Sequence, residues 1–155
     1  MIARGPALLF TAWALHDVEE ALAFPSTCDA LAERTGIDGL RIGRRQSWVA
    51  VGLMGIVIAV ACWRGSRTGG RSKLYRAAVA GLEWHVYTHL AASVAQRRYT
   101  AGVATAVPVM LPGAILARRE LERDGIPIRA RDSARGAALL LPGAIVSQIL
   151  ARFVP

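Results

Sequence analysis

The sequence PALLFTAWALHDVEEALAF, residues 6–24, places a cluster of ionisable side chains inside an apolar run. A histidine and three carboxylates occur within the five residues from His16 to Glu20, and apolar residues flank them on both sides. The whole stretch is close to the ~20 residues that an α-helix needs to cross the hydrocarbon core of a bilayer. A charge cluster usually marks a solvated loop or helix face, so this one has to be explained before the stretch is interpreted as a membrane span.

The composition of the 155-residue chain is typical of a membrane protein with several spans. Hydrophobic residues make up 54% of it and charged residues 19%, and the mean hydropathy is positive. No apolar segment alternates with period two, so we expect helical spans rather than barrel strands. We therefore predict an all-α fold, a polytopic transmembrane helix bundle of about five helices in one membrane-embedded domain covering residues 1–155. The predicted spans are residues 6–24, 47–63, 77–96, 99–117 and 136–151.

The net charge of +8 comes mainly from arginines in the short connectors between these segments. The sequence offers no recognition helix and no basic stretch with interleaved aromatic residues, so we expect no nucleic-acid partner. The connector 64–76 carries five cationic residues and no acid, and the connector 118–135 carries six arginines. Placing both connectors and Arg4 in the cytoplasm puts twelve of the nineteen cationic residues on that side, as the positive-inside rule favours. We expect a cytoplasmic N-terminus and a C-terminus on the opposite side.

A second interpretation of the first segment is a cleaved signal peptide. Arg4 would form its basic region, residues 6–15 its apolar region, and Ala21-Leu22-Ala23 its cleavage motif. Four ionisable residues just before a cleavage site are unusual, and the basic region would hold a single charge. We therefore favour a retained span, and sequencing the mature N-terminus distinguishes the two interpretations.

On a helix, three of the four ionisable side chains in the first segment face the same direction. Each residue turns about 100°, so with His16 at zero, Glu20 lies at about +40° and Glu19 at about −60°. Asp17 falls at the far flank of this stripe and is the member least expected to belong to a site. Charged side chains at bilayer depth cost about 2.5–3.5 kcal/mol each, so the stripe needs partners on another helix.

The third segment, which contains GLEWHVYTHLAASVAQ at 81–96, offers those partners. His85 and His89 are four residues apart and share a helix face. One crossing separates the first and third segments, so the two run parallel. At 1.5 Å per residue, His16 and Glu20 lie within roughly 3 Å of the depth of this histidine pair. The two helices can therefore meet through these side chains.

Imidazoles and carboxylates on facing helices form a donor set for a divalent metal ion. Mixed nitrogen and oxygen donors without thiolate suit Zn²⁺ or Fe²⁺, with Mn²⁺ as a further candidate, and we expect no nucleotide cofactor. An open coordination position would make the metal catalytic. Glu19 would be a further ligand or the general base, so that the catalytic candidates are Glu19, Glu20 and His16. The predicted metal ligands are His16, Glu19, Glu20, His85 and His89. The favoured function is a membrane-embedded, metal-dependent enzyme acting on a lipophilic small molecule that enters from the bilayer.

Three other interpretations of the cluster stay open. In a metal-free acid–base site, Glu19 or Glu20 would donate a proton and a histidine would accept one, which suits an isomerase or cyclase. The cluster could instead form part of a proton or cation pathway, although few polar side chains beyond Thr88 and Gln96 would extend it. It could also be a structural polar network that holds two helices together. The sequence leaves the oligomeric state open.

Two motifs resemble those of a known family. HDVEE at 16–20 fits an H-x-x-E-E signature, and EWHVYTHLAAS at 83–93 followed by Tyr99–Gly102 is similar to a downstream histidine helix and a Y-x-P-G turn. The chain thus resembles the HXXEE family of small bacterial integral membrane proteins, whose function is poorly defined, over residues 10–115. Ala101 replaces the proline of the turn. The resemblance implies a bacterial inner (plasma) membrane location and a polar centre formed by His16, Glu19, Glu20, His85 and His89.

Overall fold

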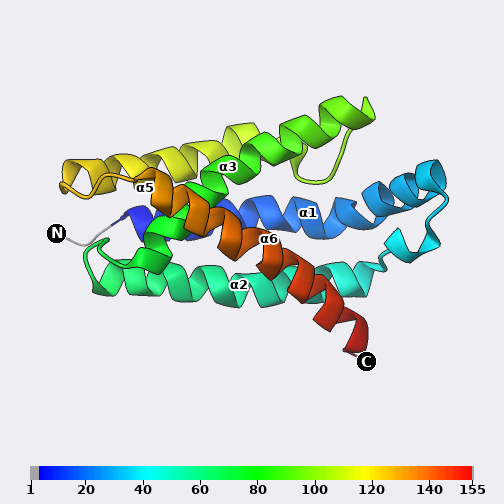
Figure 1. Cartoon of the computed structure of the whole chain (residues 1–155), viewed down its shortest axis with the longest axis horizontal. Helices are drawn as coiled ribbons and strands as arrows, with labels where there is room; N and C mark the ends of the chain where they lie inside the picture. Colours follow the sequence, from blue (N-terminus) through cyan, green and yellow to red (C-terminus); the bar gives the residue numbers. More distant parts are fainter. Residues whose placement is uncertain (1–3, 155) are drawn as a thin grey trace.

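The computed structural model describes residues 4–154, and every regular element in this part of the chain is helical. The five long helices are α1 (Gly5–Thr35), α2 (Arg44–Arg67), α3 (Lys73–Gln96), α5 (Leu111–Arg123) and α6 (Ala130–Phe153). The short elements are the 3₁₀ turn η1 (Asp38–Leu40), α4 (Val103–Thr105) and the π-helical turn η2 (Ala106–Met110). The predicted all-α bundle of about five helices is confirmed (Figure 1).

The helices pack around α1, which contacts α2 on one side and α5 on the other. The α6 helix crosses from α3 to α2 over the face of the bundle seen in Figure 1. At the α3–α6 crossing the backbones touch, because a Cβ atom on Gly136 would lie 2.6 Å from the backbone nitrogen of Gly81. Large side chains such as Leu9, Ile58 and Tyr75 fill the space between the helices.

The first helix is longer than predicted. The sequence pattern placed its end before Pro25, but α1 continues for ten more residues to Thr35, with Pro25 inside it. Proline lacks an amide donor and therefore opens the backbone ladder, which hydroxyl side chains can partly satisfy. The hydroxyls of Ser26 and Thr27 both donate to the carbonyl of Ala23, one turn before them. These bonds do not replace the one that Pro25 cannot give, whose acceptor would be the Ala21 carbonyl four residues before it. The helix continues past the predicted end with Cys28 and Ala32 buried, so packing of its later turns supports it.

The fourth predicted segment, 99–117, begins as a turn rather than as a helix. The chain reverses direction after Gln96, and helical structure resumes only at α4. The π-helical turn η2 follows and contains Pro108, whose missing amide donor disturbs the regular helical ladder. The helix α5 follows this turn and ends at Arg123. This irregular stretch brings the residues around Thr105 next to α1.

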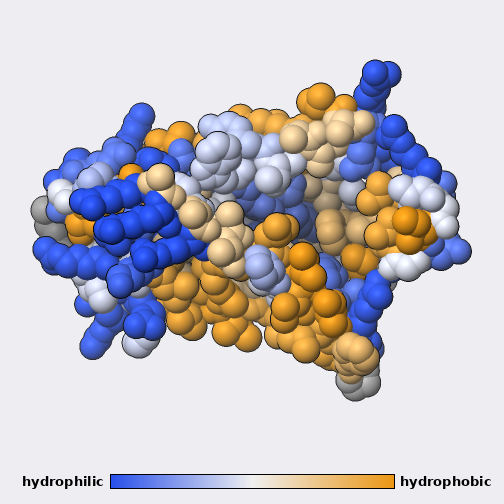
Figure 2. Space-filling view, viewed as in Figure 1, coloured by the Kyte–Doolittle hydropathy of each residue, from blue (hydrophilic) through white to orange (hydrophobic). Residues whose placement is uncertain are grey.

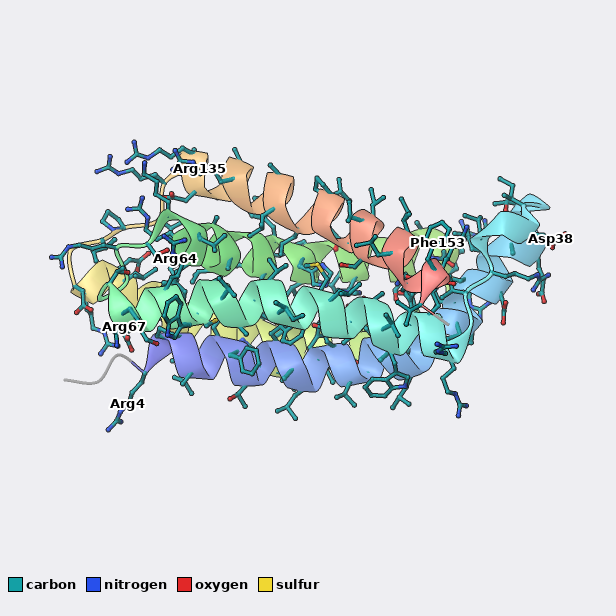
Figure 3. The ribbon with its side chains drawn as sticks, turned by 90° about the horizontal axis from the view of Figure 1, so that it is seen from below. Arg4, Asp38, Arg64, Arg67, Arg135 and Phe153 are labelled. Atoms are coloured by element: carbon teal, nitrogen blue, oxygen red, sulfur yellow. The ribbon has the colours of Figure 1, made fainter. Side chains whose placement is uncertain are left out.

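Cationic side chains gather where the connectors predicted them. Arg4, Arg64, Arg67 and Arg135 lie at one end of the bundle, and Asp38 lies at the other (Figure 3). Between the two hydrophilic ends, the visible face carries a broad hydrophobic band (Figure 2). The chain therefore has the charge distribution along its long axis that the connector sequences predict.

Among the described residues, two helices are long and apolar enough to cross a membrane by length and composition, α2 and α6. The other three fall short for identifiable reasons. Histidines and carboxylates lower the hydropathy of α1 and α3, and α5 is only 13 residues long. Two of the five predicted crossings thus correspond to candidate spans, and the other three crossings stay predictions.

Candidate metal centre

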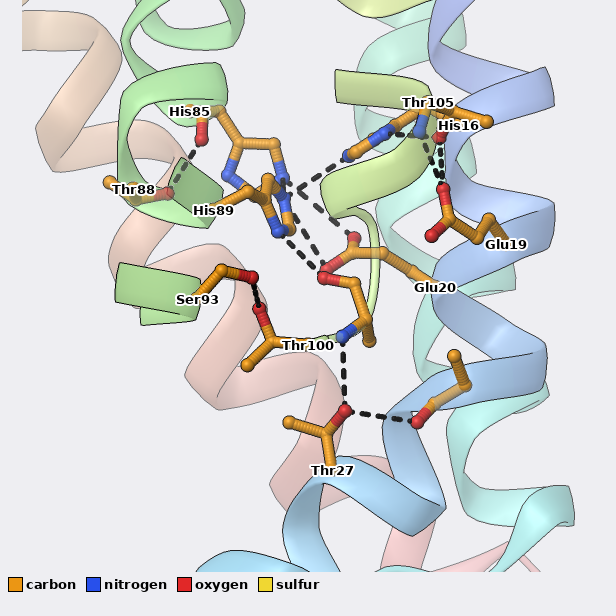
Figure 4. Close-up of polar contacts among 12 residues, drawn as sticks. His16, Glu19, Glu20, Thr27, His85, Thr88, His89, Ser93, Thr100 and Thr105 are labelled. Atoms are coloured by element: carbon orange, nitrogen blue, oxygen red, sulfur yellow. Dashed lines mark hydrogen bonds and ion pairs between the residues drawn. The ribbon is translucent and has the colours of Figure 1, made fainter. Parts of the chain in front are cut away.

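Three imidazole rings converge between α1 and α3 (Figure 4). The Nε2 atoms of His16 and His89 are 3.1 Å apart, and those of His89 and His85 are 2.9 Å apart. His16 is fully buried, and His89 is 7% exposed. The prediction that the histidines of the first and third segments meet at one depth is confirmed by these distances.

Glu20 completes the group from the α1 side. Its Oε1 lies 3.6 Å from Nε2 of His89, and its Oε2 lies 3.7 Å from Nε2 of His85. One donor atom from each residue of a four-residue group falls within 4.8 Å of the others, and the group is His16, Glu20, His85 and His89. Such a group could hold a metal ion. A tetrahedral zinc ion about 2.0–2.1 Å from its ligands spaces them about 3.3–3.4 Å apart. The pairs that include Nε2 of His89 or His85 given above, at 2.9–3.7 Å, lie near this spacing.

The hydrogen bonds around His16 determine which of its ring nitrogens carries the proton. The hydroxyl of Thr105 donates its only proton to Oε2 of Glu19 at 2.5 Å. The same hydroxyl lies 2.9 Å from Nδ1 of His16, and since its proton is already used, it accepts a bond from this nitrogen. The proton of a neutral His16 is therefore on Nδ1, and the lone pair of Nε2 points toward His89.

A backbone carbonyl likewise determines which ring nitrogen of His89 carries the proton. Nδ1 of His89 lies 2.8 Å from the oxygen of Ala101, which can only accept, so this nitrogen is protonated. Nε2 of a neutral His89 then carries a lone pair. Two lone pairs that face each other at 3.1 Å repel unless a cation lies between them. This arrangement of outer hydrogen bonds is the one usually found around histidines that bind metals.

The sequence of the chain is similar to that of one known protein family. The family model described as "Protein of unknown function with HXXEE motif" matches residues 7–117. The chain belongs to the HXXEE family. No curated protein and no solved structure matches it significantly. The HXXEE motif is HDVEE at 16–20, and its first and last residues, His16 and Glu20, are both members of the candidate metal centre.

Glu19, the middle of the three named signature residues, is not part of the four-residue group and contacts Thr105 beside it. Its carboxylate accepts bonds from the hydroxyl of Tyr99 and from the backbone amides of Ala104 and Thr105. It thereby satisfies amides at α4 that have no partner within that short helix. Glu19 reaches His16 only through the Thr105 hydroxyl, so its role as a direct ligand or general base stays a prediction.

The turn after α3 fits tightly against the two buried histidines. Gly102 has φ of +82°, and a Cβ atom there would lie 2.5 Å from Cε1 of His89 and 2.9 Å from Cε1 of His16. Only glycine fits this position without displacing a ring. Ala101, which replaces the proline of the similar family turn, donates its backbone amide to the Thr27 hydroxyl at 3.0 Å. A proline could not make this bond.

A cavity of about 510 Å³ adjoins the centre between α1, α2 and α6. Glu20 and His85 lie in its wall, so the candidate metal centre borders it directly. Asp17 lies in the same wall and is 5% exposed. Helical spacing places Asp17 at the flank of the His16 stripe, where it is the residue least expected to belong to a site, yet that flank faces the cavity.

Proposed function

We propose that this protein is a membrane-embedded, metal-dependent enzyme that acts on a lipophilic small molecule. The observation that carries the proposal is the pair of Nε2 atoms, on His16 and His89, held 3.1 Å apart with both protons fixed on the opposite nitrogens. A structural ion-pair network has no need of two lone pairs in contact. A divalent cation between them would turn this repulsion into coordination by nitrogen.

The residues have distinct roles in this proposal. His16, Glu20, His85 and His89 would hold the ion, which supplies Lewis acidity to a substrate oxygen or to water when bound. The chain from Glu19 through Thr105 to His16 stabilises positive charge on the imidazole and raises its basicity as a ligand. With nitrogen and carboxylate donors and no thiolate, zinc and iron are the leading candidates, with manganese as a further one.

The cavity supports a lipophilic substrate. Its volume lies within the range of roughly 300–1,000 Å³ typical of small-molecule sites. Apolar side chains make up most of its wall beyond the metal centre, among them Phe24, Leu31, Val51, Met54 and Ile145. Glu20 and His85 border it while His16 is fully buried, so a molecule in the cavity would approach the ion from the side of these two ligands.

A bilayer as surroundings is supported by the apolar residues on the outside of the bundle. Large side chains exposed by half or more lie on helices all around it, for example Leu22, Ile56, Trp84 and Leu141. A soluble monomer rarely exposes so much contiguous apolar surface. The cavity opens between helices that include both candidate spans, α2 and α6, so a substrate dissolved in lipid could reach it without passing through water.

A second candidate function is metal-free acid–base catalysis. It is favoured by the hydrogen-bonded series Glu19–Thr105–His16, whose last member touches His89. A proton shared between the two Nε2 atoms would also relieve their repulsion. The two functions differ in metal content, because only the first requires an ion.

The enzymatic part of the proposal is tested with lipid extracts. The purified protein, loaded with zinc, iron(II) or manganese in turn, is incubated with a lipid extract of its host and the extract is profiled by mass spectrometry. We expect one lipophilic compound to be consumed by the loaded protein and not by the chelated protein or by His89→Ala. Consumption that persists in chelated protein would favour acid–base catalysis, and no consumption under any loading would contradict an enzyme.

A further inference from the structure

The side chain of Asp17 is buried with one oxygen unused. Its Oδ2 has no hydrogen-bond partner among the described residues, although only 5% of the residue is exposed. Leaving a buried polar group without a partner costs about 1–3 kcal/mol, and more when the group is charged. Asp17 also lines the cavity beside Glu20 and His85. An unpartnered carboxyl group in the wall of a cavity is a candidate to bind a polar group of a molecule held there.

The cavity is elongated, with Asp17 at one end. The α1 residues that line it recur at helical spacing, and they are Asp17, Glu20, Phe24, Cys28 and Leu31. At 1.5 Å per residue, the stretch from Asp17 to Leu31 extends about 21 Å along the helix. Beyond Asp17 and Glu20 this stripe offers only apolar side chains and a buried thiol. The wall formed by α1 therefore suits a narrow apolar chain with its polar end at Asp17, while α2 and α6 add polar side chains such as Gln46, Gln148 and Arg152.

We propose that the substrate is an elongated lipophilic molecule whose terminal hydrogen-bond donor, a hydroxyl or an ammonium group, is bound by Asp17. The proposal rests on the proposed function in taking the cavity as the substrate site. A carboxyl group keeps an oxygen that accepts hydrogen bonds whether or not it is ionised, so a donor is a suitable partner in either form.

This placement brings the polar end of the substrate next to the metal centre. Glu20 lines the cavity and also belongs to the four-residue group, so the group borders the cavity. A group bound to Asp17, one helical turn before Glu20, lies on the cavity side of the ligands. Asp17 thereby determines which substrates present a reactive group to the centre, without being a ligand itself.

The test measures binding, separately from activity. The full-length protein in lipid nanodiscs is labelled with a diazirine analogue of hexadecanol, and the labelled peptides are mapped by mass spectrometry. Unlabelled hexadecanol, its methyl ether and hexadecylamine compete at equal mole fractions in the lipid. We expect labelling of cavity residues such as Met54 and Phe24, and competition by the alcohol or the amine at about tenfold lower mole fraction than by the ether.

Variants at Asp17 distinguish the two donors. Asp17→Leu removes the acceptor and should abolish the preference over the ether. Asp17→Asn keeps an acceptor but no charge, so it should retain a preference for the alcohol and lose one for the amine. A variant with Asp17 intact, Ala144→Phe, fills the cavity from α6 and should reduce labelling by all three compounds.

Two outcomes would overturn the inference. They are equal competition by the ether and both donors in the native protein, and an unchanged preference in Asp17→Leu. Metal content, measured on the same samples, separates this result from the proposed function. A native protein that holds metal but binds alcohol and ether alike refutes the Asp17 assignment alone. One that prefers the donors but holds no metal refutes the metal centre and leaves the Asp17 assignment supported.

Discussion

At the scale of single residues, the centre depends on side chains that would not touch the metal. The Thr105 hydroxyl and the Ala101 carbonyl fix the protons of His16 and His89 on Nδ1. Gly102 lets the turn after α3 lie against both rings. Outer hydrogen bonds of this kind orient metal ligands and are worth about 10–100-fold in metal affinity. Two substitutions test this role.

Thr105→Val removes the hydroxyl between Glu19 and His16 while keeping the side-chain shape. We expect metal affinity to fall by about 10–100-fold, because His16 loses the acceptor that fixes its tautomer. Competition against a chelator of known affinity measures the change. Thr88→Val is the matched control, since the Thr88 hydroxyl donates only to the His85 carbonyl of its own helix. Equal losses in both variants would contradict the role of Thr105.

Gly102→Ala places a methyl group within 2.5 Å of the His89 ring at a positive φ. We expect a loss of about 1–3 kcal/mol in stability from backbone strain, together with weaker metal binding because a ring must move. Thermal unfolding with and without metal measures both effects. Gly125→Ala is the control, because Gly125 also has positive φ but a Cβ atom there meets nothing within 4 Å. A centre in which the turn plays no part would show equal metal binding in the two variants.

The sequence predicted the inner residues of the site better than the outer ones. Helical angle and depth place His16 and Glu20 opposite His85 and His89, because all four lie on regular helices whose geometry is known in advance. Thr105 is 89 residues from His16 in the sequence and reaches it through an irregular turn, which no periodicity describes. The position of Asp17 in the cavity wall could not be predicted from the sequence. The cavity is formed with α2 and α6, and helical angles on α1 alone do not show where those helices pack.

At the scale of elements, α1 serves two neighbours at once. His16 and Glu19 face α3 and the turn at α4, whereas Asp17 and Phe24 face the cavity, and Glu20 belongs to both. The sequence predicted this helix but not its length, since continuation past Pro25 depends on the packing of its later turns, in which Cys28 and Ala32 are buried. The end of the cavity near Leu31 is formed in part by the turns of α1 that follow Pro25.

The α3–α6 crossing is held by two glycines. A Cβ atom on Gly136 would lie 2.5 Å from the Ala77 carbonyl oxygen and 2.7 Å from Cα of Gly81, so Gly136→Ala must push the helices apart. We expect a destabilisation of about 1–3 kcal/mol, measured by thermal unfolding in detergent. In Gly143→Ala on the same helix, the new methyl group meets only the flexible Met54 side chain, and the effect should be smaller. A reversed order would contradict the close crossing.

At the scale of the whole molecule, cationic side chains lie at one end of the bundle and apolar surface lies between its two ends. The two Arg-rich connectors and Arg4 lie at one end of the bundle, and an apolar band follows along its length (Figures 2 and 3). The sequence predicted this polarity because the connectors are short and each joins helices at one end. The sequence also predicted α1 and α3 as spans, but these two helices do not qualify by hydropathy. The polar residues that form the site lower their hydropathy.

Orientation in the membrane is tested with single cysteines in a background where buried Cys28 and Cys62 are replaced by alanine. Exposed positions at the two ends are Arg67 and Gly39. By the positive-inside rule, we expect Gly39→Cys to react with an impermeant maleimide in intact cells and Arg67→Cys to react only after lysis. The reverse pattern would invert the orientation, and labelling of both in intact cells would contradict a membrane-spanning bundle.

In the proposed function, His16, Glu20, His85 and His89 hold one divalent metal ion, and the four residues are placed so that they could do so. The most direct measurement is the metal content of the native protein, purified in mild detergent without chelators, beside His89→Ala and the control Thr88→Val. We expect about one ion of zinc, iron or manganese per chain in the native protein and the control, and almost none in His89→Ala with its helix content retained. A native protein with no more metal than His89→Ala, after incubation with each ion, would contradict it.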